Sequence, residues 1–275
     1  MSHGFPEDPL ARALGYPYPR HPGPVLFDPA TGAHDVHVVD IGPEREHVVE
    51  GLSRPVPARA IAVGIEGQTI EIDDVVAMIA AGSNGSTVQL ARKYRDRRSA
   101  RPILIAPAAV TGAVSVYSAH ITAYGSVPAT MHAAPDAGAA LHVLLMPAEE
   151  LGHMNATEAL GVNYVLAAPD AMQARVEAVS FARPPAYVSK RGAVTLDAGP
   201  VLLPQTGGEE TGYPEAGQRE MLERVMVHIG ATGSLEAFVT RMIGDRRARA
   251  DVTARLAETA WRWELDPDEI VADGT

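Results

Sequence analysis

Two segments of the sequence combine residue types that could hold and activate a small substrate. The first, Gly82-Ser83-Asn84, directly follows the apolar run at residues 74–81. A glycine-rich turn between a buried strand and a helix can direct several backbone N–H groups into one concavity, which suits a carboxylate or an oxyanion. The second segment contains Glu158 among apolar neighbours near the end of a predicted helix. A partly desolvated carboxylate at such a place could accept a proton and return it, as general acid/base catalysis requires.

Both segments also have a simpler interpretation. Glycine-rich turns between a strand and a helix are common without a ligand, and a glutamate at a helix end is usually solvated. The order of the segments favours the functional interpretation. An apolar strand leads into the turn, a β-rich stretch follows, and then comes a unit that contains Glu158, Gly161 and Tyr164.

This order resembles the γ-glutamylcyclotransferase-like family over about residues 72–185. In that family a Y-G-S-N turn lies between the first strand and the first helix, and its backbone amides hold the γ-glutamyl group. A single glutamate, followed shortly by glycine and tyrosine, acts as the general acid/base. The resemblance therefore implies that Glu158 is catalytic and that Gly82, Ser83, Asn84 and Tyr164 bind the substrate.

The activity that the resemblance implies needs neither a cofactor nor a metal. It is an enzyme that acts on an amide bond of a small amino-acid-like substrate, as a cyclotransferase or an amide hydrolase. In a cyclotransferase the substrate's own amine attacks its γ-carbonyl, while Glu158 moves the proton. The alternative, from a different class, is a non-catalytic ligand-binding or accessory module that keeps the turn as an anion cradle.

The chain departs from the family pattern in two places. Ala81 stands where the family has a tyrosine before the turn, so an aromatic wall or hydroxyl is missing there unless Tyr94, Tyr117 or Tyr124 replaces it. The glycine context after the glutamate is also altered, because Glu158 is followed by Ala159-Leu160-Gly161.

The histidines give weaker signals for chemistry. His34 and His37 lie three residues apart without a third ligand, which favours an exposed pair over a metal site. His132 and His142 are predicted on paired strands facing one side of the sheet. His153 precedes Glu158 by about one turn, and reaches it only if the helix continues.

Other functional classes are excluded by motif and composition. No G-x-S-x-G or phosphate-binding glycine motif occurs, and the chain has no cysteine. The net charge of −11 disfavours nucleic-acid binding. No stretch approaches the roughly 20 apolar residues that span a bilayer, and the N-terminus lacks a signal-peptide pattern, so we expect a cytoplasmic protein without membrane contact. The Ala- and Arg-rich, Lys-poor composition fits a GC-rich bacterial genome, so we expect a bacterial protein.

The predicted fold class is α+β, in three parts. Residues 1–70 form a Pro-rich arm and short strands, 71–190 a small mixed β-barrel of the γ-glutamylcyclotransferase-like type, and 191–275 a helical C-terminal extension. Prolines should keep the first 29 residues extended, without a packed element. The aromatic residues of this arm could attach it to the body or to a second subunit, which makes a homo-oligomer through the arm a candidate assembly.

Short β-branched runs and helical spacing predict the elements. The predicted strands cover 36–40, 58–63, 74–81, 103–105, 114–123, 127–132, 140–146, 163–168 and 176–181. The predicted helices follow Ser86 and Pro147 and cover 218–229, 235–243 and 248–263, with a short helix or turn near residues 43–52. In the first helix Arg92, Lys93 and Arg95 are predicted to point outward, as part of a solvated basic helix end.

Overall fold

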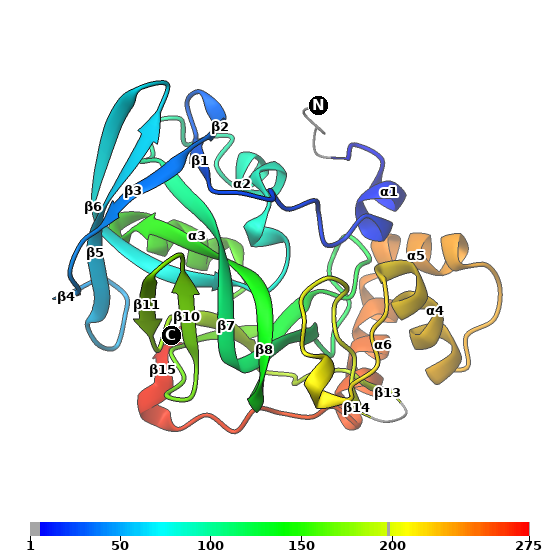
Figure 1. Ribbon diagram of the computed structural model, residues 1–275. Helices are drawn as coiled ribbons and strands as arrows, with labels where there is room; N and C mark the ends of the chain where they lie inside the picture. Colours follow the sequence, from blue (N-terminus) through cyan, green and yellow to red (C-terminus); the bar gives the residue numbers. More distant parts are fainter. Residues whose placement is uncertain (1–5, 197–198, 275) are drawn as a thin grey trace.

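The computed structural model describes residues 6–196 and 199–274, and shows a mixed α+β protein (Figure 1). Its main feature is a 13-stranded sheet whose central path runs β11-β10-β7-β8-β6-β12-β9-β15. Pairing between the named strands is antiparallel in the described residues except between β12 and β6. The predicted α+β class is therefore confirmed.

The bounds of the elements are as follows. The strands are β1 (Val25–Asp28), β2 (Gly32–Asp35), β3 (His37–Ile41), β4 (Arg45–His47), β5 (Val56–Ile65), β6 (Gln68–Ala80), β7 (Ile103–Tyr117), β8 (Ala129–Pro147), β9 (Tyr164–Ala167), β10 (Gln173–Val176), β11 (Val179–Ala182), β12 (Ala186–Ser189), β13 (Thr195–Leu196), β14 (Gly199–Pro200) and β15 (Ile270–Ala272). The α-helices are α1 (Pro9–Leu14), α2 (Thr87–Lys93), α3 (Leu151–Thr157), α4 (Gln218–His228), α5 (Leu235–Gly244) and α6 (Arg246–Glu258). Single 3₁₀ turns are η1 (Ser83–Gly85), η2 (Ala148–Glu150), η3 (Glu209–Thr211) and η4 (Pro267–Glu269).

The predicted barrel is not observed as a closed barrel in the described part of the chain. The strand path has two ends, β11 and β15, which do not pair with each other. Both are short strands that pair on one side only, with β10 and β9 respectively. The sheet therefore stays open. The division predicted at residue 70 falls inside β6, which pairs with β5 along most of its length.

The long β7–β8 hairpin replaces four predicted short strands. Its register shifts between Thr111 and Gly112, opposite the segment that contains Pro135. Gly112 has a φ of 82°, and a side chain there would collide with the carbonyl oxygen of Ala171. Gly112 and Pro135 both suggest strand ends in the sequence. In the structure they lie at a β-bulge, and both strands continue past it. The opposite error occurs at 176–181, where Glu177 in the left-handed region turns the chain from β10 into β11.

The N-terminal arm is packed, contrary to the prediction of an extended segment. Asp8 caps α1, and α1 contacts α5 (Figure 1). Beyond the helix, Tyr16 and Tyr18 are buried against the body of the same chain. The short helix or turn predicted near residues 43–52 was also partly wrong, because β4 forms there and pairs with β5.

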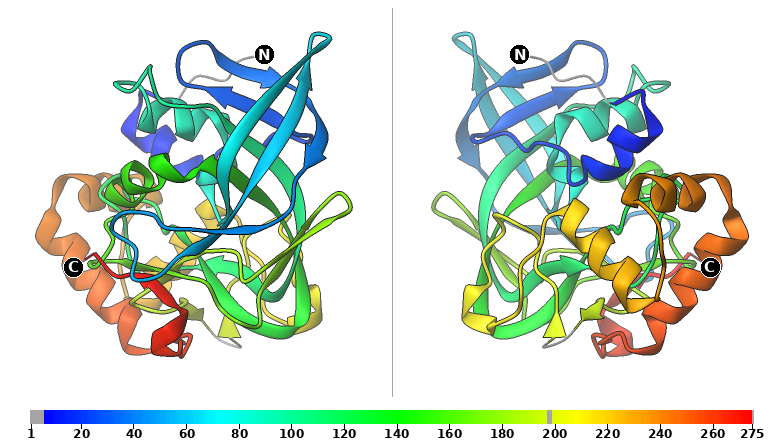
Figure 2. Two further views of the ribbon diagram at one scale, coloured as in Figure 1. Left: turned by 90° about the vertical axis from the view of Figure 1, so that its left-hand side faces the viewer. Right: turned by 90° about the vertical axis from the view of Figure 1, so that its right-hand side faces the viewer.

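The C-terminal helices gather beside the sheet, on the same side of the molecule as α1 in both views of Figure 2. Ser234 caps α5 as predicted, with its hydroxyl oxygen accepting from the Ala237 N–H at 3.2 Å. Buried side chains such as Leu222, Phe238 and Leu256 join these helices to Tyr117 of the sheet in one apolar cluster. No helix in the described ranges is long and apolar enough to cross a membrane.

Candidate functional site

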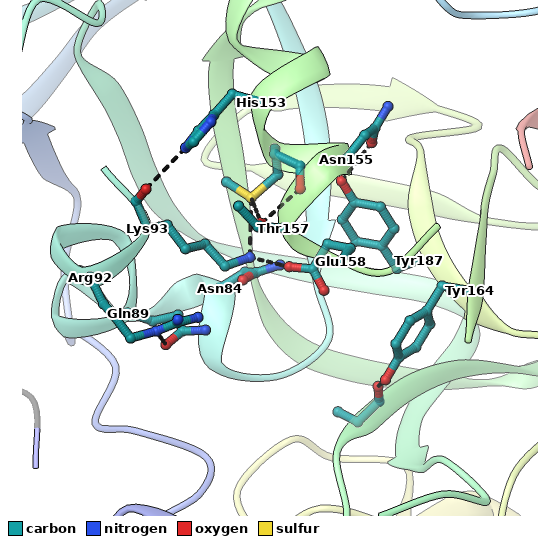
Figure 3. Close-up of polar contacts among 12 residues, drawn as sticks. Asn84, Gln89, Arg92, Lys93, His153, Asn155, Thr157, Glu158, Tyr164 and Tyr187 are labelled. Carbon is teal, nitrogen blue, oxygen red and sulfur yellow. Dashed lines mark hydrogen bonds and ion pairs between the residues drawn. The ribbon is translucent and has the colours of Figure 1, made fainter. Parts of the chain in front are cut away.

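The residues that the sequence singled out lie around one cavity of about 70 Å³. The turn Gly82-Ser83-Asn84 follows β6, Glu158 ends α3, and Tyr164 begins β9 (Figure 3). The parallel pairing of β12 with β6 and the antiparallel pairing of β12 with β9 bring these elements together. Residues 74 positions apart in the chain therefore share one cavity wall.

Glu158 is held at one of its two carboxylate oxygens. Its Oε1 accepts a hydrogen bond from Asn84 Nδ2 at 3.0 Å and forms an ion pair with the ammonium of Lys93. Its Oε2 has no hydrogen-bond donor among the described residues, and Figure 3 shows it turned away from Lys93. The side chain is 17% exposed, so one oxygen is fixed and the other is open to the cavity.

Lys93 corrects a prediction, because it does not point outward. Its side chain is only 2% exposed, and Nζ contacts Met154 Sδ at 3.3 Å as well as Glu158. Burial lowers the pKa of Lys93, while the charge of Glu158 acts in the opposite direction. The signal for this lay in the spacing, since Gln89, Leu90 and Lys93 share the inward face of α2 at i, i+1 and i+4.

The turn lines the cavity and carries backbone N–H groups that have no hydrogen-bond acceptor in the described residues. The N–H groups of Gly82, Ser83 and Asn84 donate no hydrogen bond within the described residues, whereas those of Gly85 and Ser86 close the 3₁₀ turn onto Gly82 and Ser83. Unpaired N–H groups beside a cavity suit a carbonyl or carboxylate oxygen.

Four tyrosine rings complete the wall. Tyr124, one of the three rings proposed to compensate for Ala81, lines the cavity, as do Tyr164 and Tyr187. Tyr164 donates to the Ala129 carbonyl at 3.0 Å, and Tyr187 donates to Asn155 Oδ1 at 2.7 Å. The fourth ring, Tyr16, comes from the N-terminal arm and was missed at the sequence level. Its position depends on tertiary packing, which no local pattern reports.

The other two candidate rings lie elsewhere. Tyr94 packs in the core with Phe27 and His153, and Tyr117 donates its hydroxyl hydrogen to the Ala216 carbonyl at 3.0 Å. Neither lines the cavity. Of the three tyrosines proposed to compensate for Ala81, Tyr124 therefore lines the cavity, and Tyr16 lines it as well.

No histidine in the described part of the chain lines this cavity. His153 bonds the Lys93 carbonyl at 3.0 Å and so supports the backbone of α2 rather than Glu158. His132 and His142 lie on the same strand, β8, instead of on paired strands. Among residues 6–196 and 199–274, no three His, Cys, Asp or Glu side chains are grouped to hold a metal ion.

Comparisons with protein-family models, with curated proteins and with solved structures gave no match for this chain. The resemblance to the γ-glutamylcyclotransferase-like family therefore stays a prediction, carried by the residues of the cavity alone.

Proposed function

We propose that this protein is an enzyme that cleaves an amide bond of a small amino-acid-like substrate, with Glu158 as general acid/base. One observation carries the proposal. A carboxylate with a free oxygen and a turn with three unpaired N–H groups line the same cavity. The first can move a proton and the second can hold an oxygen on which negative charge develops.

The reaction that uses both features is intramolecular cyclisation of a γ-glutamyl amide. The α-amine nitrogen attacks the γ-carbonyl carbon, and Glu158 Oε2 takes one proton from that amine. The carbonyl oxygen gains negative charge beside the N–H groups of the 82–84 turn. The bond from carbon to the leaving amide nitrogen then breaks, and Glu158 returns the proton to that nitrogen. The products are a five-membered lactam and a free amine, so no water is consumed.

Lys93 and Asn84 fix the geometry of this step. Both engage Oε1, so they orient the carboxylate plane and direct Oε2 toward the cavity. Placing the amine, carbonyl and carboxylate together replaces an entropically costly encounter by a bound arrangement.

One observation favours a second function, a binding module. Glu158 is already engaged in an ion pair with the buried ammonium of Lys93, and such a pair also suits a site that only holds a ligand. Such a carboxylate can still hold the ammonium of a ligand while the turn holds its carboxylate or carbonyl. In this function the cavity binds an amino-acid-like molecule and leaves it unchanged.

Turnover of a panel of γ-glutamyl amides, measured by mass spectrometry, separates the two functions. For an enzyme we expect Glu158→Gln to lower kcat by about 10²–10⁴-fold while the substrate still binds. The matched control is Glu149→Gln, an exposed glutamate in η2 close to α3. Binding by the wild type without turnover of any amide supports the binding module instead.

A further inference from the structure

Tyr16 enters the cavity from the packed N-terminal arm, next to the turn. The hydroxyl group lies so close to Gly82 that a Cβ atom at this position would overlap it, and the same Cβ would lie 2.9 Å from Ala129 Cβ. The arm is also fixed to the turn by a hydrogen bond, because the Tyr18 N–H donates to Ser83 Oγ at 3.1 Å. The arm thus forms part of the cavity wall in the same chain.

The Tyr16 hydroxyl has a hydrogen to donate. Its oxygen accepts from the Ala129 N–H at 2.7 Å, which fixes the position of the ring. Within the described residues no acceptor binds its own hydrogen. Burial raises the pKa of Tyr16 well above its ordinary value, so the hydroxyl keeps this hydrogen at neutral pH. A buried O–H without an acceptor is costly, and a ligand oxygen in the cavity would satisfy it.

We propose that Tyr16 donates a hydrogen bond to the substrate oxygen held by the 82–84 turn. This inference rests on the proposed function, and adds a donor supplied by the N-terminal arm. Gly82 leaves the space for the hydroxyl, and Ala81 places no ring beside the turn. The phenol and the backbone N–H groups then face the same developing charge.

The test compares Tyr16→Phe with Tyr18→Phe, in the full-length protein. Tyr18 is a buried tyrosine on the same arm whose ring does not line the cavity. With a γ-glutamyl amide as substrate, loss of one such donor should lower kcat by about 10²–10³-fold for Tyr16→Phe. KM should change by less than about threefold, and Tyr18→Phe should behave like the wild type. A purely structural hydroxyl would leave kcat unchanged.

A second measurement does not depend on turnover or on the stability of Tyr16→Phe. The eight tyrosines are labelled with ¹³C at the Cζ atom in the Glu158→Gln protein, and the amide is added. We expect the Tyr16 resonance, assigned through its correlation to the backbone signals of residue 16, to shift on binding.

The outcomes distinguish the two proposals. If the wild type turns over the amide and Tyr16→Phe retains full kcat, the role of Tyr16 is overturned and the proposed function stands. The same holds if the wild type turns over the amide and the Tyr124 and Tyr164 signals shift on binding while that of Tyr16 does not. If Tyr16 shifts on binding but the wild type turns over no amide, the contact stands and the enzymatic function is wrong. If no tyrosine signal shifts and no turnover occurs, both are overturned.

Discussion

Lys93 and Glu158 form an ion pair inside the protein, although 65 residues separate them in the chain. Lys93 comes from the end of α2 and Glu158 from the end of α3, so the pair joins the helix after the glycine-rich turn to the helix that carries the carboxylate. The pair makes the orientation of Glu158 depend on the packing of both helices.

Removal of the Lys93 charge should destabilise the protein and impair the site together. In Lys93→Met the partly buried Glu158 keeps only Asn84 as a donor, and breaking such a pair costs about 3 kcal/mol of unfolding free energy. We also expect kcat to fall, because Lys93 no longer helps Asn84 to orient the Glu158 carboxylate. Urea titration and kcat for a γ-glutamyl amide measure these two effects.

The double variant Lys93→Met with Glu158→Gln is the control for this prediction. It removes both charges, so most of the lost unfolding free energy should return while activity does not. If Lys93→Met and the double variant have equal free energies of unfolding, Lys93 and Glu158 are not energetically coupled.

Position 82 should require glycine, because a side chain there has no space beside Tyr16. In Gly82→Ala the new Cβ meets the Tyr16 hydroxyl, so the arm must move and both stability and ligand binding should fall. Adding Tyr16→Phe removes the overlapping oxygen, and we expect it to recover part of the unfolding free energy. A double-mutant cycle by urea titration gives the coupling energy, and strict additivity would argue against this contact.

Replacing Ala159 by glycine should stabilise the protein. Ala159 has a φ of 51° immediately after Glu158, and a left-handed alanine costs about 1 kcal/mol relative to glycine. The matched control is Ala156→Gly, an exposed position within α3, where glycine should cost about 1 kcal/mol. The two substitutions should therefore shift the urea midpoint in opposite directions. Loss of stability in both would mean that the turn holds no strain.

The buried His120 should make the protein less stable in acid. Burial lowers the pKa of His120 from 6.5 to about 3, so between these values the unfolded chain binds a proton that the folded chain does not. Stability therefore falls as the pH drops from 6.5 toward 3, by up to about 1.4 kcal/mol per pH unit.

Urea titrations between pH 7 and pH 5 test this dependence. His120→Gln should reduce the slope, whereas substitution of the exposed His37 should leave it as in the wild type. An unchanged slope in His120→Gln would assign the acid sensitivity to other groups.

The sequence predicted those parts of the site that have local signals. The turn and the end of α3 are marked by glycine, by capping residues and by apolar runs, and the structure places Asn84, Glu158 and Tyr164 at one cavity. The burial of Lys93 and Tyr16 was not predicted, because a basic run and a proline-rich arm are usually exposed. Only tertiary packing buries these two side chains. The open sheet was missed for a similar reason, since strand spacing does not report which edges meet.

The most direct test of the central claim is a crystal structure of the Glu158→Gln protein with a bound γ-glutamyl amide. We expect the γ-carbonyl oxygen within hydrogen-bond distance of the N–H groups of the 82–84 turn, and the α-amine about 3 Å from the side chain of residue 158. Two results would contradict the account. One is an empty cavity at a saturating concentration of the amide, and the other is a bound amide whose α-amine points away from residue 158.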